Sequence, residues 1–378
     1  MKTYDTIVIG LGGMGSAVLY HLARRGQRAV GIEQFGIGHD RGSSHGRTRI
    51  IRRAYFEHPG YIPLIDTSYR LWAELESDTG RTLMRRTGLL LLGRPDGVVI
   101  PGVRQAAAEH QLAIDEVPLS EVRRRFPGLR PTDQMEALYE ADAGYLLCDD
   151  CVRAHIEQAQ AHGATLVTDT PVQRWQADDG GVEVWTEGAH FHAGHLVVCG
   201  GAWSAELLSE LDLPFVVRRK VVMWFDATGE ECTLQAGCPV FCFDTADGFF
   251  YGFPRMDDDG VKVAEHTGGE LVDRAGQVDR TLHPTDLEPV RRFIEAHLVG
   301  VATSPRRHAI CMYTMTPDEN FIVDRHPQHP RVLIAAGFSG HGFKLAPIIG
   351  CTVADLIIDG ATTAPIGFLR ASREAMTR

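Results

Sequence analysis

The pattern of apolar and polar positions at the start of the chain predicts a strand, a helix and a second strand. Residues 3–9 are mostly β-branched or apolar, and a group of glycines follows them. From residue 13 to residue 25, apolar side chains recur at the spacing of one helical face, and Gly26 stands where a glycine often ends a helix. A second strand is expected over residues 28–33. A βαβ unit of this kind predicts a parallel sheet and an α/β fold.

The remaining pattern predicts two kinds of sheet. Further helices are expected over residues 61–76, 98–111, 149–163 and 345–358, and further strands over 87–92, 164–167 and 332–336. Residues 182–198 alternate between apolar and polar positions, which indicates a β-meander that ends in a core strand. Residues 220–266 are rich in Val, Phe, Tyr and Trp between short turns, which favours a mainly antiparallel sheet. We therefore expect a Rossmann-type domain with a parallel sheet and a second, mainly antiparallel domain.

Length, charge and cysteine content narrow the function classes. The 378 residues suffice for two domains, and the formal net charge of -11 argues against a nucleic-acid partner. No apolar run reaches the roughly 18 to 20 residues of a membrane span, and the apolar N-terminus is interrupted by Gly10 and Gly12. We expect a cytoplasmic protein that makes no membrane contact and keeps its eight cysteines as free thiols. The single CxxC of Cys148 and Cys151 is interpreted as two unrelated thiols, and no metal site is expected.

The first glycine motif predicts a dinucleotide site. Gly10, Gly12 and Gly15 fit G-x-G-x-x-G between the expected strand and helix, and Glu33 ends the next strand. The first glycine permits the tight turn, the second admits a pyrophosphate to the main chain and the third packs the helix on the strand. The acidic residue accepts hydrogen bonds from a ribose. The motif leaves open whether the dinucleotide is NAD or FAD.

Two later segments favour a flavin. Residues 334–344 leave a strand through Gly340, Gly342 and Phe343 and enter a helix, so free N–H groups would face the pyrimidine side of a reduced flavin. Residues 197–203 form a second strand that ends in glycines, including Gly200, just before Trp203. Either segment alone could equally be a tight strand–helix connection.

Four segments make the chain recognisable. It resembles the family of monomeric sarcosine oxidase and N-methyltryptophan oxidase, within the wider glycine and D-amino-acid oxidase superfamily, nearly from end to end. The segments that carry the resemblance are SSHGRTRIIR at 43–52, YGFP at 251–254, CMYT at 311–314 with PDE at 317–319, and GHGFK at 340–344.

The resemblance implies FAD joined covalently, through its 8α-methyl group, to the sulfur of Cys311. A thiolate is needed for this attachment, and we expect Arg306, Arg307 and His308 to favour it. Without the resemblance, Cys311 would be interpreted as a packed core residue. The residues expected to bind the cofactor are Gly10, Gly12, Gly15, Glu33, Ser43, Ser44, Arg49, Val172, Gly200, Trp203, Cys311, Gly340, Gly342, Phe343 and Lys344.

The resemblance also implies a substrate site. Arg52 and Lys344 resemble the pair of cations that holds the substrate carboxylate, although two surface cations would be the ordinary interpretation. Tyr251 and His341 would face the amine, and Arg49 and His45 would lie near the flavin ring.

A further lysine is expected to act on oxygen. Lys262 lies on an alternating strand, where a lysine usually faces solvent. Its spacing from Tyr251 matches a family lysine that promotes the reaction with O2. A cation there would stabilise the negative charge that develops on O2.

Two positions depart from the family pattern. Arg47 stands where an acidic residue is expected, which would change the charge balance near the flavin. Cys242 stands where sarcosine oxidase has a bulkier methionine, which predicts more room in the pocket. Residues 261–269 also read closer to N-methyltryptophan enzymes, so we expect a substrate with a sizeable side chain to be preferred over sarcosine.

The sequence therefore predicts a flavin-dependent oxidase of a small N-methylated amino acid. Its FAD domain would use residues 1–85, 140–215 and 310–378, and its substrate domain residues 86–139 and 216–309. We expect a monomer whose partners are the amino acid and O2. The alternatives are an oxidase or dehydrogenase of glycine, a D-amino acid or a cyclic imino acid, an NAD-dependent dehydrogenase, and a flavin-binding module without activity.

Overall fold

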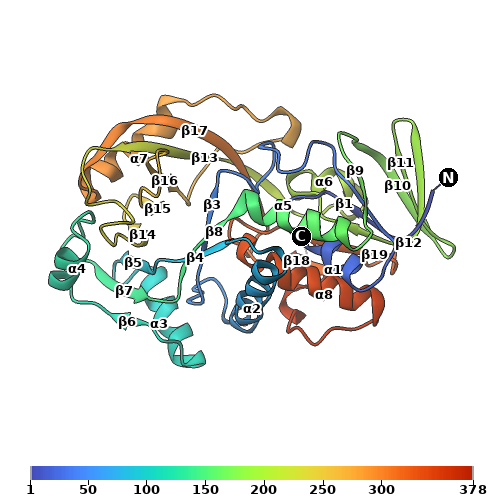
Figure 1. The fold of residues 1–378 in the computed structure, drawn as a ribbon, viewed down its shortest axis with the longest axis horizontal. Coiled ribbons are helices and arrows are strands. Elements are labelled where there is room, and N and C mark those ends of the chain that lie inside the picture. Colours follow the sequence, from blue (N-terminus) through green and yellow to red (C-terminus); the bar gives the residue numbers. More distant parts are fainter. Residues whose placement is uncertain (1, 377–378) are drawn as a thin grey trace.

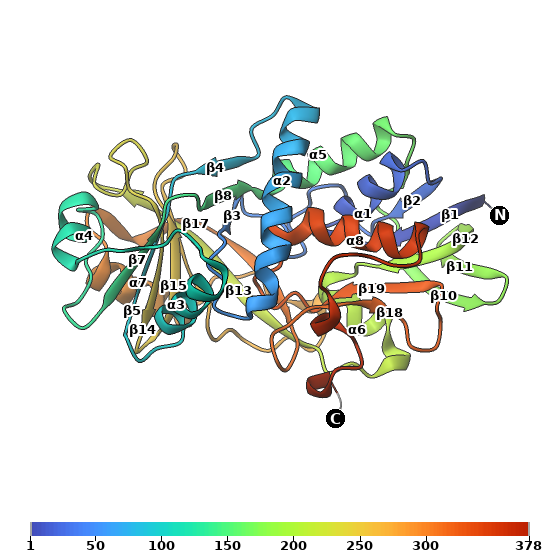
Figure 2. The same ribbon diagram turned by 90° about the horizontal axis from the view of Figure 1, so that it is seen from below.

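Two large sheets form the opposite ends of an elongated molecule (Figures 1 and 2). The computed structural model describes residues 2–376. The sheet at the N-terminal end has a parallel centre formed by β1 (Lys2–Ile9), β2 (Ala29–Ile32), β9 (Thr165–Val167), β12 (Ala189–Val198) and β19 (Val332–Ala336). Antiparallel strands complete it, namely β10 (Val172–Asp178), β11 (Gly181–Thr186) and β18 (Ile322–Arg325). This arrangement confirms the predicted α/β class.

Helices bury the central strands of this sheet. The inner half of β1 is almost inaccessible to solvent, as its apolar sequence requires. The helices of this end are α1 (Gly13–Arg24), α2 (Ile62–Thr79), α5 (Cys148–Ala161), α6 (Ser204–Leu207) and α8 (Ala346–Ile358). Helix α1 packs between α5 and α8, and α2 stands between the two ends of the molecule (Figure 2). The first turn of α1 therefore lies at the carboxyl end of β1, where parallel sheets bind their ligands.

The second large sheet is antiparallel except where β14 runs parallel to β5. Its strands, in spatial order, are β17 (Val301–Met315), β13 (Val216–Ala227), β16 (Val261–Glu265), β15 (Gly248–Phe253), β14 (Val240–Thr245), β5 (Leu89–Gly93), β7 (Glu136–Glu140) and β6 (Asp115–Glu116). The helices of this end are α3 (Val99–His110), α4 (Leu119–Arg125) and α7 (Pro284–His297). The mainly antiparallel character expected for residues 220–266 is confirmed.

A small sheet and two long strands join the ends. The small sheet contains β3 (Thr48–Ile51), β8 (Gly144–Leu147) and β4 (Met84–Arg86), and it lies between the large sheets in Figure 1. Strands β13 and β17 are 12 and 15 residues long, and they run from the second sheet towards the first. Both features bring residues that are distant in sequence to the junction of the two ends.

The predicted elements agree with the structure to within about three residues, but several elements were missed. The missed strands include β3, β8 and the long β17, whose alternation is interrupted by runs of polar residues. The proposed domain boundaries remain predictions.

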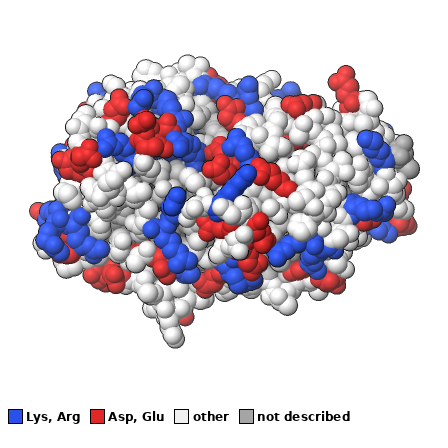
Figure 3. All heavy atoms as spheres, in the orientation of Figure 1, with Lys and Arg blue, Asp and Glu red and all other residues white. Residues whose placement is uncertain are grey.

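No helix within residues 2–376 combines the length and apolar character needed to cross a membrane. On the face shown in Figure 3, basic and acidic side chains are interspersed, so this face offers no extended basic surface.

Candidate active site

The larger of two neighbouring cavities lies at the carboxyl ends of the parallel strands and has a volume of about 430 Å³. Most of the residues predicted to bind the cofactor line it. They are Gly10, Gly12, Glu33, Ser43, Ser44, Arg49, Val172, Gly200, Trp203, Gly340, Gly342 and Phe343. The structure thus brings together segments from all three predicted parts of the FAD domain. Gly15, Cys311 and Lys344 were also predicted, but they do not line this cavity.

The three glycines of the first motif have different physical roles. Gly10 has φ +85°, and a Cβ there would lie 2.4 Å from the carbonyl oxygen of Cys199. A Cβ on Gly15 would lie 1.7 Å from the carbonyl oxygen of Gly10, so helix α1 can approach the turn only through a glycine. A Cβ on Gly12 would meet nothing closer than the Ser44 Oγ at 3.6 Å. Gly12 therefore leaves open space beside the N-terminus of α1, as an incoming pyrophosphate would require.

Glu33 lies at the other edge of this cavity and also holds the glycine turn. Its side chain is buried, and Oε2 accepts a hydrogen bond from the backbone N–H of Leu11 at 2.7 Å. Oε1 accepts one from Phe35 N–H at 3.1 Å. A carboxylate oxygen can accept more than one hydrogen bond, so Glu33 can also receive ribose hydroxyls.

Cys311 is buried next to the larger cavity, near the end of β17. Its Sγ lies 3.6 Å from the carbonyl oxygen of Ser43 and 3.6 Å from Nη2 of Arg49. The prediction that Arg306, Arg307 and His308 would be the basic groups beside Cys311 was wrong. Instead, the side chain of Arg306 bonds to Asp226 and that of Arg307 bonds to Asp259. His308 bonds to the carbonyl of Arg280. The cations nearby are Arg49, in contact with the sulfur, and Lys220, opposite Cys311 on β13, which neighbouring positions in the sequence could not reveal.

The second cavity is smaller, about 70 Å³, and shares Arg49, Gly340 and Phe343 with the first. It contains most of the predicted substrate and catalytic residues. Its other lining residues are Ile50, Arg52, Glu57, Cys242, Phe249, Tyr251, His266, His341 and Lys344. Strands β3, β14 and β15 and the 340–344 loop converge there. The sequence interpretation missed Glu57, Phe249 and His266, because none of them stands in a recognisable motif.

Arg52 and Lys344 meet in this cavity together with an acidic partner. The Arg52 Nη2 lies 2.5 Å from the Glu57 Oε1, and both side chains are more than nine-tenths buried. Burial opposes the ionisation of Glu57, but Arg52 and Lys344 hold the pKa of its carboxyl at about 2. Lys344 Nζ donates to the carbonyl of His341 at 2.5 Å. Burial, together with the nearby Arg52, lowers the pKa of Lys344 to about 7. With Arg49 also in its lining, the cavity carries a net positive charge, which increases when Lys344 is protonated.

His341 offers a hydrogen-bond acceptor. Its Nε2 bonds to the carbonyl oxygen of Glu319 at 3.0 Å, whereas Nδ1 is buried and has no partner among the described residues. Burial lowers the pKa of its imidazole to about 4, so the ring is neutral near pH 7. Because a carbonyl only accepts, Nε2 carries the hydrogen and Nδ1 keeps its lone pair.

Tyr251 and His266 form another wall of the cavity. Burial raises the pKa of the Tyr251 phenol, so it stays protonated near pH 7. Burial lowers the pKa of His266 to about 3, and its Nδ1 lies 3.4 Å from the hydroxyl of Tyr313. Both groups are therefore neutral, and the charges of this cavity come from Arg49, Arg52, Glu57 and Lys344.

Lys262 is buried and does not face solvent. Its Nζ donates to the carbonyls of Gly46 at 2.8 Å and Thr48 at 3.0 Å. Arg49 Nη1 donates to the same Thr48 carbonyl at 2.8 Å, so the two cations share one acceptor. Burial and the charge of Arg49 lower the pKa of Lys262 well below its ordinary value. Lys262 lies behind the cavity walls and not in them.

His45 is also buried behind these walls. Its Nε2 lies 3.1 Å from the carbonyl of Gly42, and burial together with Arg49 lowers its pKa to about 4. It lines neither cavity. Its predicted place near the flavin ring stays a prediction; in the structure it lies close to Arg49 and on the segment that carries Ser43.

The two departures from the family pattern have different outcomes. Arg47 lines neither cavity, and its effect on the charge near the flavin stays a prediction. Its side chain is half exposed and forms ion pairs with Asp257, at 2.6 Å, and with Asp259. Cys242 does line the small cavity, and burial raises the pKa of its thiol to about 12. Within residues 2–376, no group of three or more acidic, His or Cys side chains could hold a metal ion.

Comparison with known proteins places this geometry in a family. Residues 5–356 match the model of the FAD dependent oxidoreductases. The chain is 42% identical to a monomeric sarcosine oxidase of Streptomyces avermitilis, over 99% of this chain and 98% of the relative. It is 36% identical to a monomeric sarcosine oxidase of Arthrobacter, over 99% and 97%. It is 32% identical to an N-methyl-L-tryptophan oxidase of Salmonella typhimurium, over 98% and 99%.

Solved structures share the fold at lower identity. NikD, described as an unusual amino acid oxidase essential for nikkomycin biosynthesis, superposes with a TM-score of 0.87 at 23% identity, and each chain is covered to 98%. The glycine oxidase of Geobacillus kaustophilus superposes with a TM-score of 0.82 at 19% identity, over 99% of this chain and all of the other.

Proposed function

Because the chain belongs to the FAD-dependent oxidoreductase family, in its sarcosine oxidase and N-methyl-L-tryptophan oxidase group, we propose that it oxidises the N-methyl group of a small N-methylated amino acid. The products are formaldehyde, the demethylated amino acid and H2O2, formed from the substrate, one O2 and one water. Bound FAD would accept a hydride from the carbon beside the nitrogen and deliver the two electrons to O2. The observation that carries the proposal is a cavity that contains Arg52 and Lys344 and shares Arg49, Gly340 and Phe343 with the dinucleotide cavity.

The residues of the larger cavity fit FAD. We propose that Glu33 binds the ribose and that the N–H groups at the start of α1 bind the pyrophosphate. The flavin ring would lie towards Arg49 and Gly340, where the two cavities meet. The buried thiol of Cys311 lies next to this end, with the guanidinium of Arg49 3.6 Å from its sulfur. A covalent bond between Cys311 and the 8α-methyl group is part of the proposal.

Charge selects the substrate. Arg52 and Lys344 would bind its carboxylate, Arg52 by a planar fork and Lys344 as a point charge. Because Glu57 neutralises one of these cations, the pair carries about one net charge for one carboxylate. An anion next to Lys344 would raise the pKa of that ammonium, so substrate binding and protonation of Lys344 favour each other.

The amine must be neutral to react, because a protonated nitrogen has no lone pair to assist the loss of hydride. The cations Arg49 and Arg52 disfavour a positive charge on the amine and so favour the loss of its proton. The neutral imidazole of His341 keeps an acceptor at Nδ1 that can hold the N–H of the substrate. The protonated phenol of Tyr251 lies in the same cavity. Together these groups would orient the methyl group towards the larger cavity.

Lys262 would act on oxygen. Its ammonium shares the Thr48 carbonyl with Arg49, which lines both cavities, so it lies just behind the place where they meet. A buried cation at this position can stabilise the negative charge that develops on O2. Its depressed pKa fits a group that meets an anion only during the reaction.

The volume of the small cavity favours a small substrate. A water-sized group needs about 10 to 15 Å³ on this measure, so 70 Å³ accommodates about five to seven such groups. Sarcosine is of this size, whereas an indole side chain would require the wall near Phe249 or Cys242 to move. The expected preference for a larger side chain stays a prediction, and so does the monomeric state.

The test is anaerobic mixing of the purified protein with N-methylated amino acids, free glycine, D-alanine and L-proline, followed by air. We expect N-methylated amino acids to bleach the flavin absorbance and to yield one H2O2 and one formaldehyde per turnover. Bleaching by glycine, D-alanine or L-proline, with the N-methylated compounds inert, would replace this function by an oxidase or dehydrogenase of another amine. Absence of bleaching with all of them would favour a flavin-binding protein without this activity.

A further inference from the structure

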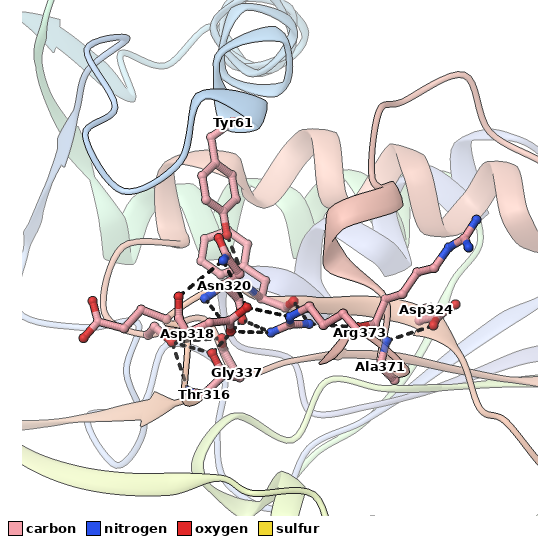
Figure 4. A network of polar contacts seen from close by, with 12 residues as sticks. Tyr61, Thr316, Asp318, Asn320, Asp324, Gly337, Ala371 and Arg373 are labelled. Atoms are coloured by element: carbon pink, nitrogen blue, oxygen red, sulfur yellow. Dashed lines mark hydrogen bonds and ion pairs between the residues drawn. The ribbon is translucent and has the colours of Figure 1, made fainter. Parts of the chain in front are cut away.

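Arg373, near the C-terminal end of the chain, holds a turn beside the candidate active site by several hydrogen bonds (Figure 4). Arg373 binds both carboxylate oxygens of Asp318, each at 2.8 Å. It also donates to the carbonyls of Asn320 at 2.7 Å and Phe321 at 2.9 Å. Its side chain is only 12% exposed. The main chain of Ala371 reinforces this attachment by donating to Asp324 at 2.9 Å. The segment lies beyond residue 356, where the match to the family model ends.

The gripped turn, residues 316–320, has an unfavourable backbone conformation. Glu319 has φ +59°, in the left-handed region that non-glycine residues seldom adopt. The turn is closed by Thr316, whose Oγ1 donates to the carbonyl of Asn320 at 2.7 Å. Such a conformation persists only when surrounding contacts hold it. Arg373 supplies four of those contacts, on both sides of Glu319.

The turn determines how His341 is held. The carbonyl of Glu319 accepts the hydrogen of His341 Nε2 at 3.0 Å, which leaves Nδ1 as the unpartnered acceptor in the ring that lines the substrate cavity. Phe321 provides a second link, because its carbonyl binds Arg373 and its ring centroid lies 4.7 Å from that of His341. Two routes therefore connect Arg373 to the orientation of one imidazole.

We propose that Arg373 is a positioning residue for His341. By holding the 316–320 turn it keeps the Glu319 carbonyl on Nε2, so that the Nδ1 lone pair faces the amine of the substrate. This inference rests on the proposed function, since it assigns His341 to the amine. Without Arg373 the turn relaxes, the imidazole loses its fixed tautomer, and the amine loses an oriented acceptor.

The test compares Arg373→Met with Arg325→Met. Arg325 is a matched control, because it also ties main-chain carbonyls of the same end, those of Pro330 and Leu356, but has no contact with the 316–320 turn. We expect Arg373→Met to lower kcat/KM for the best N-methylated amino acid about 10-fold to 100-fold, the usual cost of a misplaced catalytic group. Arg325→Met should change it less than about threefold, even if both variants lose similar thermal stability.

A pH profile separates positioning from a general loss of structure. In the wild-type protein His341 stays neutral down to pH about 4. If the ring of His341 loses its hydrogen bond and becomes exposed to water, its pKa should rise towards the ordinary value of 6.5. The acidic limb of the kcat/KM profile should then shift to higher pH. A purely structural role of Arg373 would reduce the amount of active protein but leave this limb in place.

A double mutant gives the decisive outcome. In a His341→Leu background, adding Arg373→Met should have no further effect on kcat/KM, because the group that Arg373 positions is gone. Additive losses, or equal losses in Arg373→Met and Arg325→Met, would overturn the proposal. If Arg373→Met yields too little folded protein, Asp318→Asn keeps the carbonyl contacts and should show the same shift of the acidic limb. A wild-type protein that forms no H2O2 from N-methylated amino acids would refute the proposed function instead.

Discussion

The cleft proposed to bind FAD, here the flavin cleft, and the cavity proposed to bind the substrate, here the substrate cavity, share lining residues but differ in the groups that line them. The cleft, about 430 Å³, lies at the ends of parallel strands and has many glycines in its lining. The cavity, about 70 Å³, is lined by charged, aromatic and imidazole side chains from both ends of the molecule. The cleft can therefore recognise its ligand by N–H groups and close approach, whereas the cavity must recognise its ligand by charge.

Charge behaves differently in the two places. In the cleft, the carboxylate of Glu33 accepts hydrogen bonds from the main-chain N–H groups of Leu11, in the glycine turn, and Phe35. In the cavity, Arg52, Glu57 and Lys344 are buried together, and burial brings the pKa of Lys344 to about 7. The substrate cavity, with its buried cations, therefore changes its charge near pH 7.

The largest expected effect comes from removing the proposed covalent bond between the protein and the flavin. Cys311→Ala should abolish covalent retention of the flavin, because no other thiol in the described chain is placed beside Arg49 and Ser43 in this way. The measurement is absorbance of the acid-denatured protein after filtration. The wild-type chain should stay yellow and the variant should not. A wild-type chain that also loses its colour would refute the covalent bond without touching the FAD assignment.

Two glycine substitutions separate the folding role of the cleft from its binding role. Gly15→Ala should prevent the native turn, because its Cβ would fall 1.7 Å from the Gly10 carbonyl oxygen. Gly12→Ala should fold, since its Cβ finds 3.6 Å of clearance, but should bind FAD poorly because the methyl group occupies the proposed pyrophosphate position. Thermal unfolding and flavin content check both. If Gly12→Ala retained full flavin, the pyrophosphate would have to lie elsewhere.

Lys262→Met should separate oxidation of the substrate from reaction with O2. We expect flavin reoxidation to slow about 10²-fold to 10³-fold, the usual loss for one well-placed electrostatic group, with little change in the reductive step. Lys262→Arg is the control that keeps the charge. Stopped-flow absorbance resolves the two half-reactions. Equal losses in both would show that Lys262 supports the structure around Thr48 and has no role at oxygen.

Arg52→Met and Lys344→Met should each weaken the binding of a simple carboxylate such as acetate about 10-fold to 150-fold, the cost of about 1.5 to 3 kcal/mol for a charged hydrogen bond.

Above pH 7, free Lys344 loses its proton, so wild-type affinity for acetate should fall by up to about tenfold per pH unit. That decline should be absent in Lys344→Met and retained in Arg52→Met. Titration of the flavin spectrum measures it. An identical decline in all three proteins would assign it to another group.

Sequence reasoning was most successful where structure is local. The β1–α1–β2 unit, with Gly10, Gly12, Gly15 and Glu33, follows from short-range rules of turn geometry and helix packing, and the structure places it as predicted. The 340–344 loop was also found, since it leaves a buried strand through glycines. In both cases the residues that make the site are neighbours in the chain, so their spacing carries the information.

The substrate cavity could be only partly predicted. Arg52 and Lys344 were identified through the resemblance to a family, but Glu57, which neutralises one of them, has no motif. Arg306, Arg307 and His308 were expected beside Cys311 because they are close in sequence. Alternation along the strand places Arg306 and His308 on the face opposite Cys311. Arg307 shares the face of Cys311 but lies four residues away, where it stacks on Trp224 and bonds to Asp259. Adjacent positions in the chain were therefore a poor guide to adjacent charges.

What the sequence by itself determined is the dinucleotide-binding fold, because glycine geometry and apolar periodicity act over a few residues. Only the tertiary structure decided which charges meet: that Arg49 lies beside Cys311 and shares the Thr48 carbonyl with Lys262, and that Arg373 reaches the turn that holds His341. Those contacts join residues up to 262 positions apart. The free energy of a buried charge depends on what surrounds it, and the order of residues along the chain does not specify those surroundings.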